Sequence, residues 1–171
     1  NCMLIIGAGC TNNTEKVQKK DETKLQLITL DPGHFHAALL QKSMYEEINP
    51  VVNVYAPDGD EVKAHLKLIE SYNNRTEQPT AWQEKVYTGP DYLERMLSDK
   101  AGNVVVIAGN NQKKSNYIQR SVEAGLNVLA DKPMAIDKEG FNALVKAFAT
   151  AKKNKVLLYD IMTERHEINS I

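Results

Sequence analysis

The sequence predicts an α/β fold in which a doubly wound parallel sheet carries helices on both faces. Two observations lead to this prediction. Apolar, strand-like runs alternate with helical patterns between residues 25 and 160, and this alternation favours parallel strands joined by crossover helices. In addition, residues 103–108 (NVVVIA) are largely apolar and β-branched, as expected for a strand buried on both of its faces.

The individual elements follow in order along the chain. The expected strands cover residues 25–30, 51–56, 84–87, 103–108, 127–130 and 155–159. The expected helices cover residues 35–48, 61–72, 90–97, 115–124 and 137–153. The second helix has apolar residues at helical spacing, and Gly125 marks the end of the fourth. The last helix places Phe141, Leu144, Val145 and Phe148 on one face.

Composition and charge exclude several classes of protein. The chain has 171 residues, with 21 Lys and Arg against 22 Asp and Glu. A net charge of −1 argues against a nucleic-acid partner, which requires a surplus of basic side chains. No apolar run reaches the roughly 18 residues that span a bilayer. Both cysteines, Cys2 and Cys10, lie in the first ten residues, which excludes a disulfide scaffold, a thiolate metal site and a cysteine nucleophile from the folded part.

The two ends of the chain differ from the middle. Residues 3–9 (MLIIGAG) are apolar or small, Cys10 follows, and residues 11–24 are polar. This pattern resembles a bacterial lipoprotein signal, which predicts an exported protein, periplasmic or membrane-anchored through Cys10, with residues 1–24 as signal remnant and tether. The alternative is a buried first strand with a structural cysteine in a cytoplasmic protein. Residues 25–171 form the expected domain, and we expect a further domain to follow it.

In a doubly wound sheet, ligands bind beyond the carboxyl ends of the strands. After the first strand comes Asp31-Pro32-Gly33-His34-Phe35-His36. A dinucleotide fingerprint reads Gly-x-Gly-x-x-Gly at this point, and only Gly33 matches it. His34 or His36 could donate to a phosphate or a substrate, and a capping or packing role is equally open. A His-x-His pair also suggests a metal, but no third ligand is evident in the sequence, so we expect no metal site.

Polar residues also follow the second and fourth expected strands. Asp58 stands where an NAD enzyme places the carboxylate that accepts the ribose hydroxyls, although Asp60 or a simple turn competes for this interpretation. Gly109-Asn110-Asn111 follows the fourth strand. A glycine there lets the backbone approach a ligand, and the amides can bond a ribose or a sugar. A plain polar loop is the alternative.

Asp131-Lys132-Pro133 after the fifth strand is the strongest local feature. A lysine at the end of a buried strand is presented to the cleft, where it can hold a substrate hydroxyl or transfer a proton once its pKa is lowered.

Several of these motifs together resemble the Gfo/Idh/MocA family (glucose–fructose oxidoreductase and inositol dehydrogenase). Its members carry a helix ending in Ala-Gly, a strand, and then Glu-Lys-Pro, which residues 123–133 match in order and spacing. VVVIAGNN resembles the family strand that ends in Thr-Pro-Asn, with Asn111 at the Asn. Arg165 resembles the arginine of the family's Arg-Phe pair. The resemblance covers about residues 25–168, and it departs from the family at the glycine loop, at Asp131 and near Lys114, where members often have histidine.

The resemblance implies a Rossmann domain that binds NAD or NADP, followed by an α/β domain that carries substrate and often packs subunits into a homo-oligomer. Lys132 is then the catalytic lysine beside the nicotinamide. The cofactor-binding candidates are Gly33, His34, Phe35, Asp58, Gly109, Asn110, Asn111, Asp131 and Pro133, and the substrate-binding candidates are His36 and Arg165. Because the second domain is absent from this sequence, we expect this chain alone to be inactive.

Three functions remain open at this point. The first is an NAD(P)-dependent oxidoreductase that acts on a hydroxyl of a sugar, glycoside or polyol. The second is a glycosidase that uses tightly bound NAD in a transient oxidation and elimination, as some relatives do. The third is a cofactor-free binding protein on a Rossmann scaffold, suggested by the incomplete glycine loop.

Overall fold

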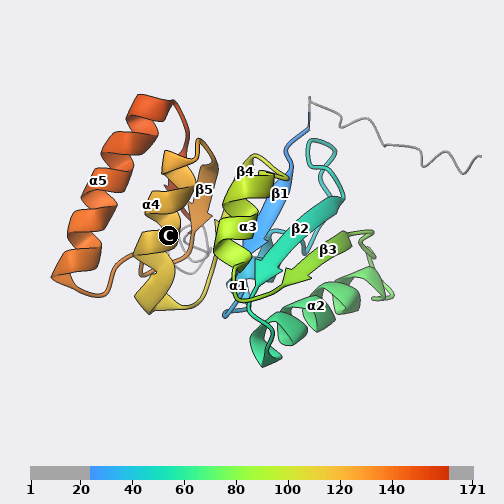
Figure 1. Ribbon diagram of the computed structural model, residues 1–171. Coiled ribbons are helices and arrows are strands. Elements are labelled where there is room, and N and C mark those ends of the chain that lie inside the picture. Colours follow the sequence, from blue (N-terminus) through green and yellow to red (C-terminus); the bar gives the residue numbers. More distant parts are fainter. Residues whose placement is uncertain (1–23, 162–171) are drawn as a thin grey trace, which may run out of the picture.

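The computed structural model describes residues 24–161, and these form a doubly wound α/β sheet (Figure 1). The predicted fold class is confirmed: all six strands are parallel, in the order β3-β2-β1-β4-β5-β6. The order reverses between β1 and β4, which lie side by side at the centre of the sheet. In such sheets the reversal marks the ligand-binding edge.

The six strands lie close to the predicted ranges. Their bounds are β1 Leu27–Leu30, β2 Val51–Ala56, β3 Gln83–Thr88, β4 Val104–Ile107, β5 Asn127–Ala130 and β6 Leu158–Asp160. The central register pairs Ile28 of β1 with Asn53 on one side and Val105 on the other. The last strand is shorter and later than expected, because Lys155 adopts left-handed backbone at the end of the preceding helix.

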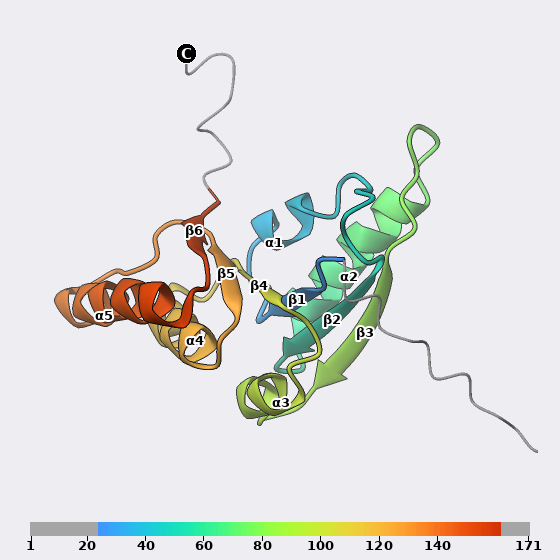
Figure 2. The same ribbon diagram turned by 90° about the horizontal axis from the view of Figure 1, so that it is seen from above.

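Helices cover both faces of the sheet (Figure 2). Their bounds are α1 His36–Leu39, α2 Asp60–Asn73, α3 Tyr92–Asp99, α4 Asn111–Glu123 and α5 Lys138–Asn154. Alternate residues of β4 point to opposite faces of the sheet. Val105 and Ile107 pack with α3, α4 and α5, whereas Val104 and Val106 pack with α1 and α2. This is the reason why β4 is apolar at every position.

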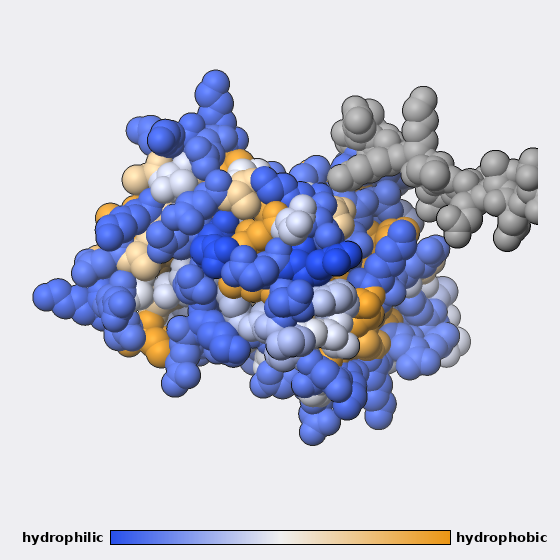
Figure 3. Space-filling model, viewed as in Figure 1, coloured by the Kyte–Doolittle hydropathy of each residue, from blue (hydrophilic) through white to orange (hydrophobic). Residues whose placement is uncertain are grey.

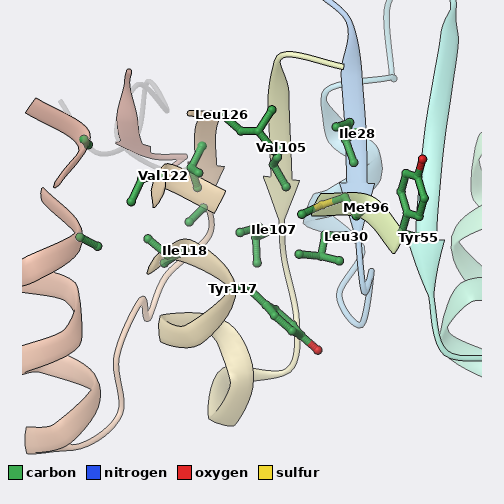
Figure 4. Close-up of a cluster of buried hydrophobic side chains, with 14 of the residues drawn as sticks. Ile28, Leu30, Tyr55, Met96, Val105, Ile107, Tyr117, Ile118, Val122 and Leu126 are labelled. Atoms are coloured by element: carbon green, nitrogen blue, oxygen red, sulfur yellow. The ribbon is translucent and has the colours of Figure 1, made fainter. Parts of the chain in front are cut away.

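The larger core lies between the sheet and α3, α4 and α5 (Figure 4). Ile28, Val105 and Ile118 are fully buried in it, and Met96 of α3 reaches the same cluster. Burial of apolar surface contributes about 25 cal/mol per Å² to the free energy of folding. The cluster therefore stabilises the strand ends, from which the loops begin.

The expected helix over residues 35–48 is wrong beyond its first turn. Only α1 is helical, and Gln41 is buried, where its amide donates to the Glu84 carboxylate of β3. Further along, the backbone runs beside the start of β1: Leu25 N donates to the Glu47 carbonyl, and Asn49 N donates to the Leu25 carbonyl. These contacts to the sheet override the helical pattern. At the other face, α4 begins four residues earlier than predicted, at Asn111.

The apolar face of α5 is largely exposed. The exposed fractions of Phe141, Val145 and Phe148 are 59%, 53% and 47%. The helix packs on α4 instead through small residues such as Ala147 and Ala151, both of which are buried. On the face that carries α3, α4 and α5, apolar side chains lie scattered among many polar ones (Figure 3). Among residues 24–161, no helix combines the length and the apolar character needed to cross a membrane.

Truncation of a core side chain tests the packing. Ile118→Ala should lower the free energy of unfolding by about 2–5 kcal/mol, because it leaves a cavity in a fully buried cluster. Phe141→Ala, at an exposed position of α5, is the matched control and should change stability far less. Urea denaturation measures both variants, and equal losses would contradict the described packing.

Candidate active site at the carboxyl edge of the sheet

The loop after β1 lies directly across the end of β4. The amides of Gly33 and His34 both donate to the Ala108 carbonyl, at 3.0 and 3.1 Å. Gly109 has a φ of +121°, and a Cβ on it would lie 2.5 Å from Gly33 Cα and N. This contact requires glycine at position 109, both for the backbone angle and for the space. It directs the β1 loop toward the end of β5.

The crossing brings both histidines of the β1 loop to Asp131, which follows β5. His36 Nδ1 lies 2.8 Å from Asp131 Oδ2, and His34 Nδ1 lies 3.6 Å from the same oxygen. His36 and Asp131 are buried, whereas 43% of the His34 side chain is exposed. The three residues could together hold a metal ion. The sequence prediction found no third ligand because 95 residues separate His36 from Asp131.

Two lysines lie beside this cluster. Lys114 of α4 is 1% exposed and donates to the Asp131 carbonyl at 3.1 Å and to Asn111 Oδ1 at 2.8 Å. Burial lowers the pKa of Lys114, because it penalises the charged form. Lys132 is exposed, its backbone N–H donates to Asp131 Oδ1 at 2.8 Å, and its peptide bond to Pro133 is cis. Lys114 was not among the candidate site residues predicted from the sequence, because its burial depends on α4 beginning at Asn111 and packing against the end of β5.

Asp31, which stands at the first fingerprint glycine, points into the protein. Its carboxylate accepts from Tyr117 Oη at 2.6 Å and from Asn110 Nδ2 at 3.3 Å. The Tyr117 hydroxyl also bonds Tyr92, which accepts from Lys113 at 3.2 Å. Burial and the Asp31 carboxylate raise the pKa of Tyr117, which stays a neutral donor. Asp31 is 3% exposed and both of these bonds reach its Oδ2, so this oxygen is turned away from a bound phosphate.

A cavity of about 340 Å³ opens between the β1 loop and α2. Its lining residues are Pro32, Gly33, His34, Phe35, Asp60, Glu61, Ala64, His65 and Leu68. His65 is 6% exposed and neither ring nitrogen has a protein partner among the described residues. Burial lowers its pKa to about 4.

The carboxylate predicted to bind ribose lies apart from the histidine cluster. Asp58 follows β2, is 76% exposed in its side chain and forms a loose ion pair with Lys63 at 3.8 Å. In the sheet, β1 and β4 lie between β2 and β5. Such a separation is what the two ends of an extended dinucleotide require. Arg165 and Cys10, two further predicted residues, lie outside the described residues.

The residues at this edge suit the two outer parts of a dinucleotide, the adenosine ribose and the nicotinamide, better than the pyrophosphate between them. Asp58 is exposed and its ion pair with Lys63 is loose, so its carboxylate can accept ribose hydroxyls, and Lys132 is exposed at the opposite end. The usual pyrophosphate donors are occupied, since the Gly33 and His34 amides turn to Ala108. The helix after the loop is a single turn and adds little to an anion site.

The fold and its carboxyl edge define the class of a dinucleotide-binding Rossmann domain. The family model described as "Oxidoreductase family, NAD-binding Rossmann fold", GFO_IDH_MocA, matches residues 3–159. The chain therefore belongs to the Gfo/Idh/MocA family, and NAD or NADP is its cofactor class. The resemblance inferred from residues 123–133 is thereby confirmed.

Solved structures agree with this assignment. A "putative oxidoreductase" from Parabacteroides merdae is 57% identical, with a TM-score of 0.84, over 86% of this chain and 34% of that one. The WlbA dehydrogenase from Chromobacterium violaceum, in complex with NADH and UDP-GlcNAcA, is 20% identical, with a TM-score of 0.57, over 85% and 37%. The biliverdin reductase of Synechocystis, in complex with biliverdin and NADP+, is 13% identical, with a TM-score of 0.56, over 80% and 37%. The two more distant likenesses show the fold alone.

The chain spans about a third of the length of these relatives. A comparison with curated proteins finds no match.

Substitution of the crossing glycine tests the contact between the β1 and β4 loops. Gly109→Ala should cost at least about 1–3 kcal/mol of stability from the backbone angle alone, and more from the clash with Gly33. Gly59→Ala is the control, because its φ of 170° is extended and no atom lies within 4 Å of the added Cβ. Thermal unfolding compares them, and a Gly109→Ala protein as stable as Gly59→Ala would refute the crossing.

The buried histidine of the cavity predicts a pH dependence of stability. The pKa of His65 is about 4 in the folded protein and 6.5 when unfolded. Between pH 6.5 and pH 4 the unfolded chain binds a proton at His65 that the folded protein does not bind. The free energy of unfolding is therefore highest above pH 6.5 and falls as the pH is lowered toward 4. This amounts to about 3 kcal/mol, at 1.36 kcal/mol per pKa unit. In urea titrations at several pH values, His65→Leu should lose less stability than the wild type between pH 7 and pH 4. Parallel profiles would contradict the burial of a neutral His65.

Proposed function

We propose that the full-length protein is an NAD(P)-dependent oxidoreductase that acts on a hydroxyl of a sugar, glycoside or polyol. The observation that carries the proposal is the position of Lys132. It is exposed at the end of β5, on the ligand-binding edge of the sheet, and its backbone is held by the buried Asp131 carboxylate. The sugar class is supported by the WlbA dehydrogenase, a structural neighbour solved in complex with UDP-GlcNAcA.

The roles of the residues follow from their places on this edge. When bound, NAD or NADP supplies the hydride acceptor or donor. Lys132 holds the reacting hydroxyl and accepts or donates its proton. The protein thus provides the proton transfer, and the cofactor provides the hydride transfer. Asp58 accepts hydrogen bonds from the ribose hydroxyls at the other end of the edge. The buried Lys114 fixes Asn111 and the Asp131 carbonyl, so that the loops after β4 and β5 keep one arrangement.

The rest of the proposed molecule lies beyond this domain. Since the relatives are about three times as long, a second domain is proposed to carry most of the substrate contacts and the contacts between subunits of a homo-oligomer. Export and lipidation at Cys10 are proposed from the pattern of residues 3–10. Metabolic labelling with palmitate, lost in Cys10→Ser, tests the anchor.

Nucleotide content and the role of Lys132 are tested on the full-length protein, exported to the periplasm with a cleavable signal peptide in place of its own. Denaturation should release NAD(H) or NADP(H), detected by mass spectrometry. Lys132→Met should keep the nucleotide and lose about 10²–10⁴-fold in turnover of the sugar substrate, as expected for loss of proton transfer. Lys153→Met, an exposed lysine at the end of α5, is the control and should retain turnover.

The other outcomes separate the competing functions. A protein that holds no nucleotide, and binds neither NAD nor NADP when they are added, would overturn the proposal in favour of cofactor-free binding. Release of a free sugar from a glycoside without net NADH would instead assign the glycosidase reaction with retained NAD.

A further inference from the structure

We propose that His34, His36 and Asp131 form a binding site for one divalent transition-metal ion. Zinc is the ion used to test it. No metal role is assigned to these residues by the family description, and the site does not depend on the proposed reaction. It lies where the β1 loop crosses β4 and meets the end of β5.

The geometry is that of a preformed ligand set. Each residue offers one ligand atom, and all three atoms lie within 4.8 Å of one another. In a tetrahedral zinc site with bonds of about 2.1 Å, neighbouring ligand atoms are about 3.4 Å apart. The distances from Asp131 Oδ2 to the two Nδ1 atoms, 2.8 and 3.6 Å, lie on either side of this value. Side-chain rotations of the two histidines toward a common point would complete the coordination, without movement of the strands that carry them.

A hydrogen bond alone explains only part of the arrangement. His36 and Asp131 form one at 2.8 Å, but His34 directs the same ring nitrogen toward the same oxygen at 3.6 Å, which is too long for a hydrogen bond. The other carboxylate oxygen, Oδ1, is occupied by the Lys132 amide. Oδ2 is thus left to two imidazoles, and the two rings pack edge to face with centroids 4.2 Å apart. A cation between them satisfies all three groups at once.

Two lysines lie beside the proposed ligands. Lys114 and Lys132 repel a cation, but the Lys114 ammonium is engaged by Asn111 Oδ1 at 2.8 Å and by the Asp131 carbonyl at 3.1 Å. Asp131 supplies the compensating negative charge.

The ligand types and the exposure indicate the kind of metal site. Two imidazoles and one carboxylate suit zinc and ferrous iron, and such three-ligand sites keep a position open for water or a ligand oxygen. His36 and Asp131 are buried, whereas His34 is 43% exposed, so the open position faces the solvent side of the cluster. A hydroxyl or carbonyl oxygen of a small molecule is the chemistry that fits there.

Zinc binding to the full-length protein tests the proposal. The protein should carry no histidine tag, be stripped with EDTA, and be dialysed against ZnCl₂. Metal analysis and isothermal titration calorimetry should then show one zinc per chain. His34→Ala, at a half-exposed position that leaves the core intact, should weaken binding by at least about 10–100-fold, the loss seen when even outer contacts of a metal site are removed. Asp131→Asn, with its fold checked by circular dichroism, should show the same loss.

Two further measurements sharpen the result. Co²⁺ in place of zinc should give visible absorption bands that are lost in His34→Ala. Glu77→Gln, an exposed acid outside the cluster, should bind as the wild type does. The proposal is overturned if the wild type binds no stoichiometric zinc, or if His34→Ala binds it as tightly as the wild type. In either case the cluster would be explained by the His36–Asp131 hydrogen bond alone. None of these measurements requires nucleotide or turnover, so failure of the proposed function leaves this test unaffected.

Discussion

The contact of Gly33 with Gly109 and the Ala108 carbonyl governs the arrangement of the whole carboxyl edge. Two amides of the β1 loop donate to one carbonyl at the end of β4, and the absence of a side chain at position 109 permits the approach. Both loops follow strands whose apolar residues are buried in the close-packed core, which fixes where the two loops begin. The crossing explains why two histidines that follow β1 meet an aspartate that follows β5, although β4 lies between these two strands.

The same contact alters the dinucleotide site of this family member. In the common form of the fold, loop amides at a helix N-terminus face the pyrophosphate. Here those amides are occupied, the helix that follows is one turn long, and Asp31 is turned inward onto Tyr117. What the edge offers instead is a cluster of imidazole and carboxylate groups beside Lys132. His34 and Asp131, which the sequence suggested as cofactor contacts, are both members of this cluster.

Much of the fold could be predicted from local pattern. The strands at β2, β4 and β5 and the helices at α2 and α5 lie close to their predicted ranges, since apolar periodicity and glycine stops are local signals. The helix over 35–48 failed because the decisive contacts, Gln41 with Glu84 and Leu25 with Glu47, join segments far apart in sequence. The exposed face of α5 shows the same limit, since periodicity indicates an apolar side without its partner.

By itself, the sequence determined the parallel α/β class and the family, because strand composition and the Asp-Lys-Pro spacing are encoded in neighbouring residues. It also predicted which loops follow the carboxyl ends of the strands. Only the tertiary structure decided which loop residues meet. Asp131 joins His34 and His36 because the β1 loop crosses β4, and Lys114 becomes buried because α4 packs that side chain against the end of β5. These are contacts between distant segments, and their energy depends on backbone placement to within an ångström, a quantity that no local pattern of residues contains.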